Sequence, residues 1–232
     1  FEVRPLAAAS IGQVHRARTR DGRDLAVKVQ YPGVRASIDS DVDNVAALLR
    51  WSGLVPEGVD ISPMLAEAKR QLHEEADYAR EGDRLRRFGT LLADAPDFRL
   101  PELAADLTTP SVLAMTHVAG VPVESLADAP QAERDRVVRL LLELLFRELF
   151  EFRLMQTDPN FANYRYDRET GRIVLLDFGA SREFSVEAAE GYRELMRAGL
   201  AGEREAIRRA AIGVGLFAED TAPRHQDMVL DL

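Results

Sequence analysis

The sequence contains no cysteine, few histidines and almost no lysine. Without cysteine, the 232-residue chain can form neither disulfides nor thiolate zinc sites, and it has no cysteine nucleophile. Its four histidines, His15, His73, His117 and His225, show no metal-ligand spacing. The formal net charge of -9 argues against a nucleic-acid partner, because phosphate backbones require a basic protein face.

Long uninterrupted apolar runs are also missing. The most apolar stretch, residues 137–152, contains charged side chains, so it predicts an amphipathic core helix rather than a membrane span. These charged residues are Arg139, Glu143, Arg147, Glu148 and Glu151. The composition, with 46% hydrophobic and 30% charged residues, is typical of a globular protein. The chain begins at Phe1 without methionine or a signal peptide, so we expect it to be a piece of a longer protein.

The scarcity of lysine draws attention to Lys28. Of the 30 basic residues only Lys28 and Lys69 are lysines, and Lys28 lies within the apolar, strand-like run "DLAVKVQ". A compact ammonium differs in function from a planar guanidinium, so a lysine at this position indicates a specific contact. The alternative is a strand lysine that points to solvent.

The order of the predicted elements is a small strand-and-helix part followed by a mostly helical part. A turn at Asp21-Gly22 predicts a hairpin over residues 14–30. Ser62 as an N-cap and Pro63 in the first turn predict one long charged helix that ends near Leu92. The other expected elements are a helix over 35–50, a strand over 111–120, a helix over 133–152, a strand over 172–180 and further helices to the end.

The stretch "LAAASIGQVHRA", residues 6–17, has the spacing of the glycine-rich phosphate loop of protein kinases, G-x-G-x-x-G-x-V. Ala7, Ala9, Gly12 and Val14 fall on that spacing, with alanine at the first two glycine positions. Taken alone the match is weak, because alanine-rich loops before strands are common.

Two further motifs follow in the order of a kinase catalytic site. Asp158 and Asn163 keep the five-residue interval between the catalytic aspartate and the metal-binding asparagine, and "LLDFGA" then supplies Asp177 of a D-F-G motif. Phosphoryl transfer requires mainly positioning and charge neutralisation. The pattern therefore predicts Lys28 on the phosphates and oxygen ligands for Mg²⁺ at Asn163 and Asp177. Asp158 would orient an acceptor or accept its proton.

These stretches resemble the UbiB/AarF/Coq8-like (ADCK group) atypical protein-kinase-like family over nearly the whole chain. The resemblance is carried by "PLAAASIGQVHRA", "LAVKVQYPGV", "EEADYAREGDRL", "MQTDPNFANY" and "LLDFGASREF". It implies an α+β, bilobal protein-kinase-like fold that is truncated at both ends. A small strand-and-helix N-lobe would occupy residues 1–118 and a mostly helical C-lobe residues 119–232. The resemblance also implies that the alanines are the family's own pattern.

The resemblance assigns further residues to the site. It implies that Glu81 pairs with Lys28, and that Glu75 and Asp77 form an E-x-D motif. That motif would face a lysine of an N-terminal K-x-G-Q segment, which is not within these 232 residues. Adenine would be held at a hinge near residues 115–120. The implied nucleotide-binding residues are Ala7, Ala8, Ala9, Ser10, Gly12, Val14, Lys28, Glu81, Thr116 and Val118.

The implied function is that of an atypical kinase-fold, Mg²⁺-dependent ATPase or small-molecule kinase that uses ATP or ADP and supports ubiquinone or isoprenoid quinone biosynthesis. No A-P-E motif follows Asp177, which favours a small-molecule or water acceptor. Two alternatives stay open. One is an aminoglycoside-phosphotransferase-like kinase, although Gln156 and Thr157 stand where that type carries a histidine. The other is a nucleotide-binding scaffold without turnover. A cytoplasmic location is expected, with a lipid or quinone-precursor ligand and peripheral membrane contact left open.

Overall fold

The computed structural model describes residues 1–54, 59–158 and 160–230. These residues form two compact units, each of which combines segments that are distant in the sequence. The first unit comprises Phe1–Arg134 and Asp158–Ser181, and the second comprises Asp135–Thr157 and Arg182–Leu232. The division of the chain into two lobes at residue 118 stays a prediction.

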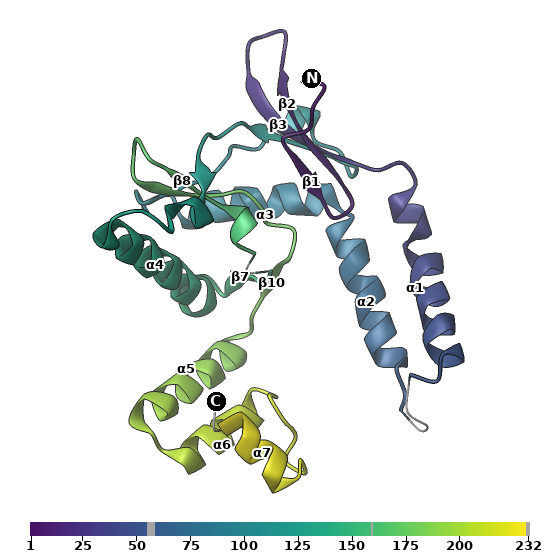
Figure 1. The fold of residues 1–232 in the computed structure, drawn as a ribbon, viewed down its shortest axis with the longest axis vertical. Coiled ribbons are helices and arrows are strands. Elements are labelled where there is room, and N and C mark those ends of the chain that lie inside the picture. The colour runs from purple at the N-terminus through teal and green to yellow at the C-terminus, as the bar shows by residue number, and fades with distance from the viewer. Residues whose placement is uncertain (55–58, 159, 231–232) are drawn as a thin grey trace. The chain divides into compact units, whose positions relative to one another are not determined.

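A four-stranded antiparallel sheet occupies the N-terminal part of the first unit (Figure 1). The order of its strands is β1 (Ala7–Ala9), β2 (Gly12–Arg18), β3 (Asp24–Gln30) and β5 (Val112–Thr116). The predicted hairpin over 14–30 is present, and Gly22 in its turn has a φ of +92°, which glycine adopts without strain. Because β3 is an interior strand, its residues 25–28 are buried.

The alanine-rich stretch is a strand where a loop was expected. Ala7 pairs with Val14 and Ala9 with Gly12, so Ser10 and Ile11 form the turn between β1 and β2. The physical reason is that antiparallel pairing with β2 satisfies the backbone groups of the short alanine segment.

The expectation of one helix from Ser62 to about Leu92 is wrong. The segment forms α2 (Ser62–Glu75) and α3 (Tyr78–Leu91), and the helix is broken at Ala76 and Asp77. Asp77 caps α3, because its carboxylate accepts a hydrogen bond from the backbone N–H of Arg80 at 3.2 Å. Two helices, the second of them capped by Asp77, therefore replace the expected continuous helix.

The start of α2 also differs by one position from the expectation. Ser62 is the first helical residue and Ile61 occupies the cap position, whereas Pro63 lies in the first turn as predicted. The carboxylate of Asp60 accepts the N–H of Ser62 at 2.9 Å and so replaces the expected serine cap. Helix α1 (Val34–Trp51) lies beside α2 in the same unit (Figure 1).

A second sheet completes the first unit. Its strand order is β4 (Phe98–Arg99), β9 (Arg172–Leu175), β8 (Tyr164–Asp167) and β6 (Val121–Pro122). Strands β8 and β9 form an antiparallel hairpin whose turn contains Gly171 at a φ of +68°, and β4 runs parallel to β9. Strand β9 ends at Leu175, earlier than expected, so Asp177 lies beyond its end.

The second unit is mainly helical. Its first helix is α4 (Gln131–Phe146), which continues into a π-helical turn, Arg147–Phe152. Strand β7 (Leu154–Gln156) follows and pairs with β10 (Ser181–Glu183), and the chain ends with α5 (Val186–Ala201), α6 (Arg204–Gly213) and α7 (Pro223–Leu230). Helix α4 buries Val137, Leu140 and Leu144, as expected of a core helix, whereas Leu142 and Phe146 are exposed. No helix in the described part of the chain has the length and hydropathy that a membrane span requires.

Candidate active site

A buried lysine lies at the centre of the candidate site. Lys28 is in β3 between two neighbouring strands, and its side chain is only 8% exposed. A buried ammonium is strongly destabilising unless it is paired. Lys28 Nζ lies 2.7 Å from Glu81 Oε1 and 3.1 Å from Asp177 Oδ2. The sheet therefore positions the lysine, and two carboxylates from other elements compensate its charge.

These carboxylates determine the charge state of the lysine. Burial lowers the pKa of Lys28, but the negative charges of Glu81 and Asp177 outweigh burial and leave that pKa above its usual value. Burial raises the pKa of Glu81, and the Lys28 ammonium opposes that rise. The lysine accordingly carries a full positive charge at physiological pH.

Helix α3 supplies a second contact to the lysine that sequence reasoning missed. The ring of Tyr78 lies 5.7 Å from Lys28 Nζ, within the range of a cation–π interaction. Burial raises the pKa of Tyr78 to about 12, so its hydroxyl stays protonated. Among the described residues, the buried Tyr78 Oη has no hydrogen-bond partner. The sequence did contain a signal for this contact. Tyr78 and Glu81 are three residues apart and so share a helix face, which places both side chains on the side of Lys28.

The β8–β9 hairpin brings the two predicted metal ligands together. Tyr164 pairs with Leu175, and the next backbone contact is the N–H of Leu176 donating to the carbonyl of Asn163 at 3.1 Å. Asn163 and Asp177 therefore lie at the same end of the hairpin, within the first unit. Asp177 Oδ1 accepts the N–H of Gly179 at 2.9 Å, and its side chain is 32% exposed.

The donor set at this end of the hairpin is compatible with a magnesium–nucleotide complex. Carboxylate and amide oxygens are hard ligands, which Mg²⁺ prefers. Within residues 1–54, 59–158 and 160–230, no three acidic or histidine side chains are grouped closely enough to hold a metal by themselves. Mg²⁺ typically takes one or two protein ligands and completes its shell with phosphate oxygens and water. Asn163 and Asp177 match that requirement.

Asp158 lies at the start of the second segment of the first unit, two residues after β7. Its side chain is exposed. A group that acts on an incoming acceptor must be reachable from solvent, and Asp158 meets this condition.

The β1–β2 hairpin carries most of the predicted nucleotide contacts. Ala7, Ala8 and Ser10 are exposed, and the Ser10 hydroxyl donates a hydrogen bond to Glu75 at the end of α2. The close packing of β2 against β3 requires glycine at position 12, because a Cβ there would lie 2.3 Å from the carbonyl oxygen of Val29. The turn is thereby held against α2 on one side and β3 on the other.

The predicted hinge begins at the end of β5, whose last residue is Thr116. The N–H of Thr116 donates to the carbonyl of Glu102 at 2.9 Å, and the Thr116 hydroxyl accepts the N–H of Glu102 at 2.8 Å. The N–H of His117 donates to the carbonyl of Asp24 at 2.9 Å, and Val118 is buried. The amide and hydroxyl of Thr116 thus serve the local structure of this segment.

An apolar contact joins α3 to the D-F-G motif. Phe178 is 2% exposed, and its ring centroid lies 5.2 Å from that of Phe88 on α3. The guanidinium of Arg80 also donates to the carbonyl of Ser181 at 3.3 Å. These contacts fix the segment after β9 against the helix that carries Glu81.

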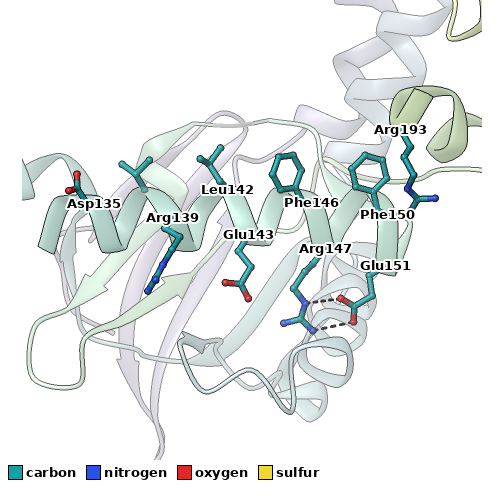
Figure 2. A pocket seen from close by; sticks show the side chains of 10 residues that line it. Asp135, Arg139, Leu142, Glu143, Phe146, Arg147, Phe150, Glu151 and Arg193 are labelled. Carbon is teal, nitrogen blue, oxygen red and sulfur yellow. Dashed lines mark hydrogen bonds and ion pairs between the residues drawn. The ribbon is translucent and has the colours of Figure 1, made fainter. Parts of the chain in front are cut away.

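A separate groove of about 930 Å³ runs along α4 in the second unit (Figure 2). Figure 2 shows Leu142, Phe146 and Phe150 in one row, and a second row contains Arg147 and Glu151, which pair at 2.9 Å. The residues that line the groove are Asp135, Val138, Arg139, Leu142, Glu143, Phe146, Arg147, Phe150, Glu151 and Arg193. None of them is a predicted site residue.

Comparisons with known proteins show which family this chain resembles. The family model of the ABC1 atypical kinase-like domain matches residues 1–211. The chain is 46% identical over 207 residues to the mitochondrial atypical kinase COQ8B of Rattus norvegicus, covering 89% of this chain and 39% of that protein. It is 38% identical over 236 residues to the mitochondrial atypical kinase COQ8 of Saccharomyces cerevisiae, covering 100% of this chain and 47% of that protein. The chain therefore spans less than half the length of these two relatives.

A solved structure is similar to this chain over nearly its whole length. Rv3197 of Mycobacterium tuberculosis, determined in complex with erythromycin, superposes with a TM-score of 0.74 at 28% identity. The match covers 98% of this chain and 58% of that one. The α+β, protein-kinase-like fold expected from the sequence is thus confirmed. With the family model matched over residues 1–211, this chain belongs to the ABC1 atypical kinase-like family, together with the COQ8 and AarF proteins.

Proposed function

We propose that this chain binds a magnesium–nucleotide complex and acts as an atypical kinase-fold ATPase or small-molecule kinase. The observation that carries the proposal is the buried Lys28 ammonium, paired with Glu81 and with the more accessible Asp177. A structural ion pair needs one carboxylate. The second, partly exposed carboxylate at the same ammonium supports a site that receives a charged ligand.

Each residue of the site has a role in this proposal. Lys28 holds phosphate oxygens, and Glu81 keeps the lysine oriented. Asn163 and Asp177 hold Mg²⁺, which when bound neutralises the charge of the phosphates. The hairpin residues Ala7, Ala8, Ala9, Ser10, Gly12 and Val14 cover the phosphates, and Thr116 and Val118 border the adenine.

Asp158 acts on the acceptor. Its exposed carboxylate would orient a hydroxyl or a water molecule and accept its proton as the new bond to the γ-phosphorus forms and the bond from that phosphorus to the bridging oxygen breaks, with ADP as the leaving group. The absence of an A-P-E motif supports a small molecule or water as the acceptor.

The biological setting is proposed from the family. The COQ8 relatives are named as mitochondrial atypical kinases. Together with the motif resemblance, this supports a role in ubiquinone or isoprenoid quinone biosynthesis, with a lipid or quinone precursor as a further ligand. The proposal keeps a cytoplasmic location for this chain, with peripheral membrane contact left open, whereas the names of the relatives place those proteins in mitochondria.

Thermal unfolding with Mg²⁺ and nucleotide, combined with a phosphate-release assay, tests the proposal. Mg-ADP or Mg-ATP should raise the melting temperature, because a ligand at 100 times its Kd stabilises the native state by about 2.7 kcal/mol. Asp177→Asn should remove most of the Mg²⁺-dependent part of that shift. Asp106→Asn makes the same chemical change at an exposed carboxylate paired with Arg23 and should leave the shift intact.

Two outcomes would contradict the assignment. A wild-type shift that is identical in EDTA would refute the metal site at Asn163 and Asp177. Nucleotide binding without any phosphate release or transfer would instead identify a nucleotide-binding scaffold.

A further inference from the structure

Glu148 is a buried acidic residue to which the proposed function gives no role. It lies in the π-helical turn after α4 and is 4% exposed. Leu144 and Phe152, four residues to either side, are buried as well. Glu148 therefore lies on the inward, apolar face of this helical segment, where a polar group must find a hydrogen-bond partner.

The partner of Glu148 is a backbone amide. Glu148 Oε2 accepts a hydrogen bond at 3.0 Å from the N–H of Gln156, the last residue of β7. Gln156 is itself 7% exposed. A buried N–H without an acceptor is costly, so the carboxyl of Glu148 fixes the end of this strand.

The start of β7 is fixed by a different contact. Arg153, which directly precedes the strand, has a left-handed backbone with a φ of +51°. Its carbonyl accepts the N–H of Phe184 at 2.9 Å. Strand β7 is thus held at both ends, by Phe184 before its first residue and by Glu148 at its last.

Asp158 follows Gln156 by only two residues. Through these two residues the end of β7, in the second unit, is connected directly to Asp158, which begins the second segment of the first unit. Misplacement of a reacting group by about 1 Å can cost about 100-fold in rate, so the lead-in strand must be rigid.

We propose that Glu148 is a positioning residue, which immobilises the end of β7 and thereby fixes the backbone that leads into Asp158. The catalytic consequence rests on the proposed function. The immobilisation of residues 154–158 can be measured without it.

The protonation state of Glu148 shows which substitution preserves the contact. Burial raises the pKa of Glu148 to about 8, so the carboxyl is largely protonated at pH 7. Glutamine is neutral, has nearly the same shape and retains a carbonyl acceptor. Glu148→Gln should therefore reproduce the interaction at neutral pH, whereas Glu148→Ala removes the acceptor.

The test compares Glu148→Ala and Glu148→Gln with Leu144→Ala, which removes a buried side chain one turn earlier on α4. Amide hydrogen exchange is measured for peptides that cover residues 154–158 relative to peptides from α5. Glu148→Ala should speed the relative exchange of residues 154–158 about tenfold or more, since the N–H of Gln156 loses its acceptor. Glu148→Gln and Leu144→Ala should leave it at the wild-type value.

The same variants are assayed for phosphate release and for binding of Mg-ADP. Glu148→Ala should lower kcat by about 10–100-fold with an unchanged Kd, because the group that it displaces acts only in the transition state. Glu148→Gln should restore kcat. Leu144→Ala should lower the melting temperature without changing kcat.

Equal relative exchange of residues 154–158 in Glu148→Ala and Leu144→Ala would overturn the inference. An unchanged kcat in Glu148→Ala, in a wild-type background that hydrolyses ATP, would also overturn it. If the wild-type chain shows neither hydrolysis nor phosphoryl transfer, the proposed function fails and the exchange result alone decides the inference. If Glu148→Ala does not fold, Glu148→Leu, which fills the site without an acceptor, takes its place.

Discussion

Lys28 Nζ and Asp177 Oδ2 lie 3.1 Å apart, although 149 positions separate the two residues in the sequence. The same ammonium contacts Glu81 at 2.7 Å. The side chain of Glu81 is 4% exposed and that of Asp177 is 32% exposed. This difference indicates that Glu81 is the structural partner of the lysine, whereas Asp177 is accessible to a ligand.

Glu81→Gln should lower the free energy of unfolding by about 3 kcal/mol, because it removes one carboxylate from a buried ammonium. Asp177 remains as a second partner, so the loss lies at the lower end of the range for such pairs. Urea denaturation provides the measurement. Asp24→Asn, which breaks the exposed pair with Arg16, is the control and should cost about 1 kcal/mol or less. Equal losses in the two variants would show that the burial of the Lys28 pair has no energetic consequence.

Asp158→Asn should reduce the rate of ATP hydrolysis by about 100- to 10,000-fold and leave the Kd of Mg-ATP nearly unchanged. A base that acts on the acceptor contributes mainly in the transition state, so its removal affects kcat rather than binding. Single-turnover kinetics and calorimetric titration measure the two quantities. A parallel loss of affinity and turnover would point to a structural role for Asp158.

Ala9→Gly, alone or with Ala7→Gly, should tighten ATP binding more than ADP binding. Residues alternate across a strand, so Ala7 and Ala9 share one face of β1, and under the proposed function each Cβ on that face would occupy space near the phosphates. The loss in stability should be about 0.5–1 kcal/mol. Titrations with each nucleotide in Mg²⁺ give the affinity ratio. Ala8→Gly, on the opposite face, should change the ratio less, and an unchanged ratio in Ala9→Gly would refute the role of the alanines.

Glu148→Gln should stabilise the protein more at pH 8 than at pH 5. The unfolded chain ionises this glutamate near pH 4.3, whereas burial raises the pKa of the folded state to about 8. Between these values the folded state binds the extra proton, so the contribution of Glu148 to stability falls as the pH rises and levels off above pH 8. Urea unfolding of both proteins at the two pH values isolates the effect, because other titrations cancel in the difference. A pH-independent difference would contradict the raised pKa.

Local spacing located most of the candidate site, although the roles of its residues stay predictions. Two motifs could be recognised in the sequence: the interval between Asp158 and Asn163, and the D-F-G motif that contains Asp177. The hairpin predicted between them brings the two motifs close together. The register of β8 and β9 places Asn163 and Asp177 at one end of that hairpin. Lys28 was readable because a lysine is rare in this chain and this one lies in an apolar strand.

Structure is hard to predict from sequence where one residue type can take either of two local roles. Asp77 reads equally well as an exposed helix residue and as a cap, and only the packing of α2 and α3 selects the cap. Glu148 was grouped with the charges that interrupt an apolar run. Its spacing from Leu144 and Phe152 indicated burial. A buried glutamate also needs a hydrogen-bond donor, however, and the backbone N–H of Gln156 comes close to Glu148 only in the folded chain.

The first unit takes residues from both sides of the Asp135–Thr157 segment, and this has a consequence for the order of folding during synthesis. Strand β4 neighbours only β9 in its sheet, so Phe98 and Arg99 have no strand partner until Ile173 and Val174 have been made. At about 5–20 residues per second, roughly 7 to 30 s separate the synthesis of Lys28 from that of Asp177. A nascent chain can therefore bury Lys28 against Glu81 before Asp177, the second carboxylate at this ammonium, has been synthesised.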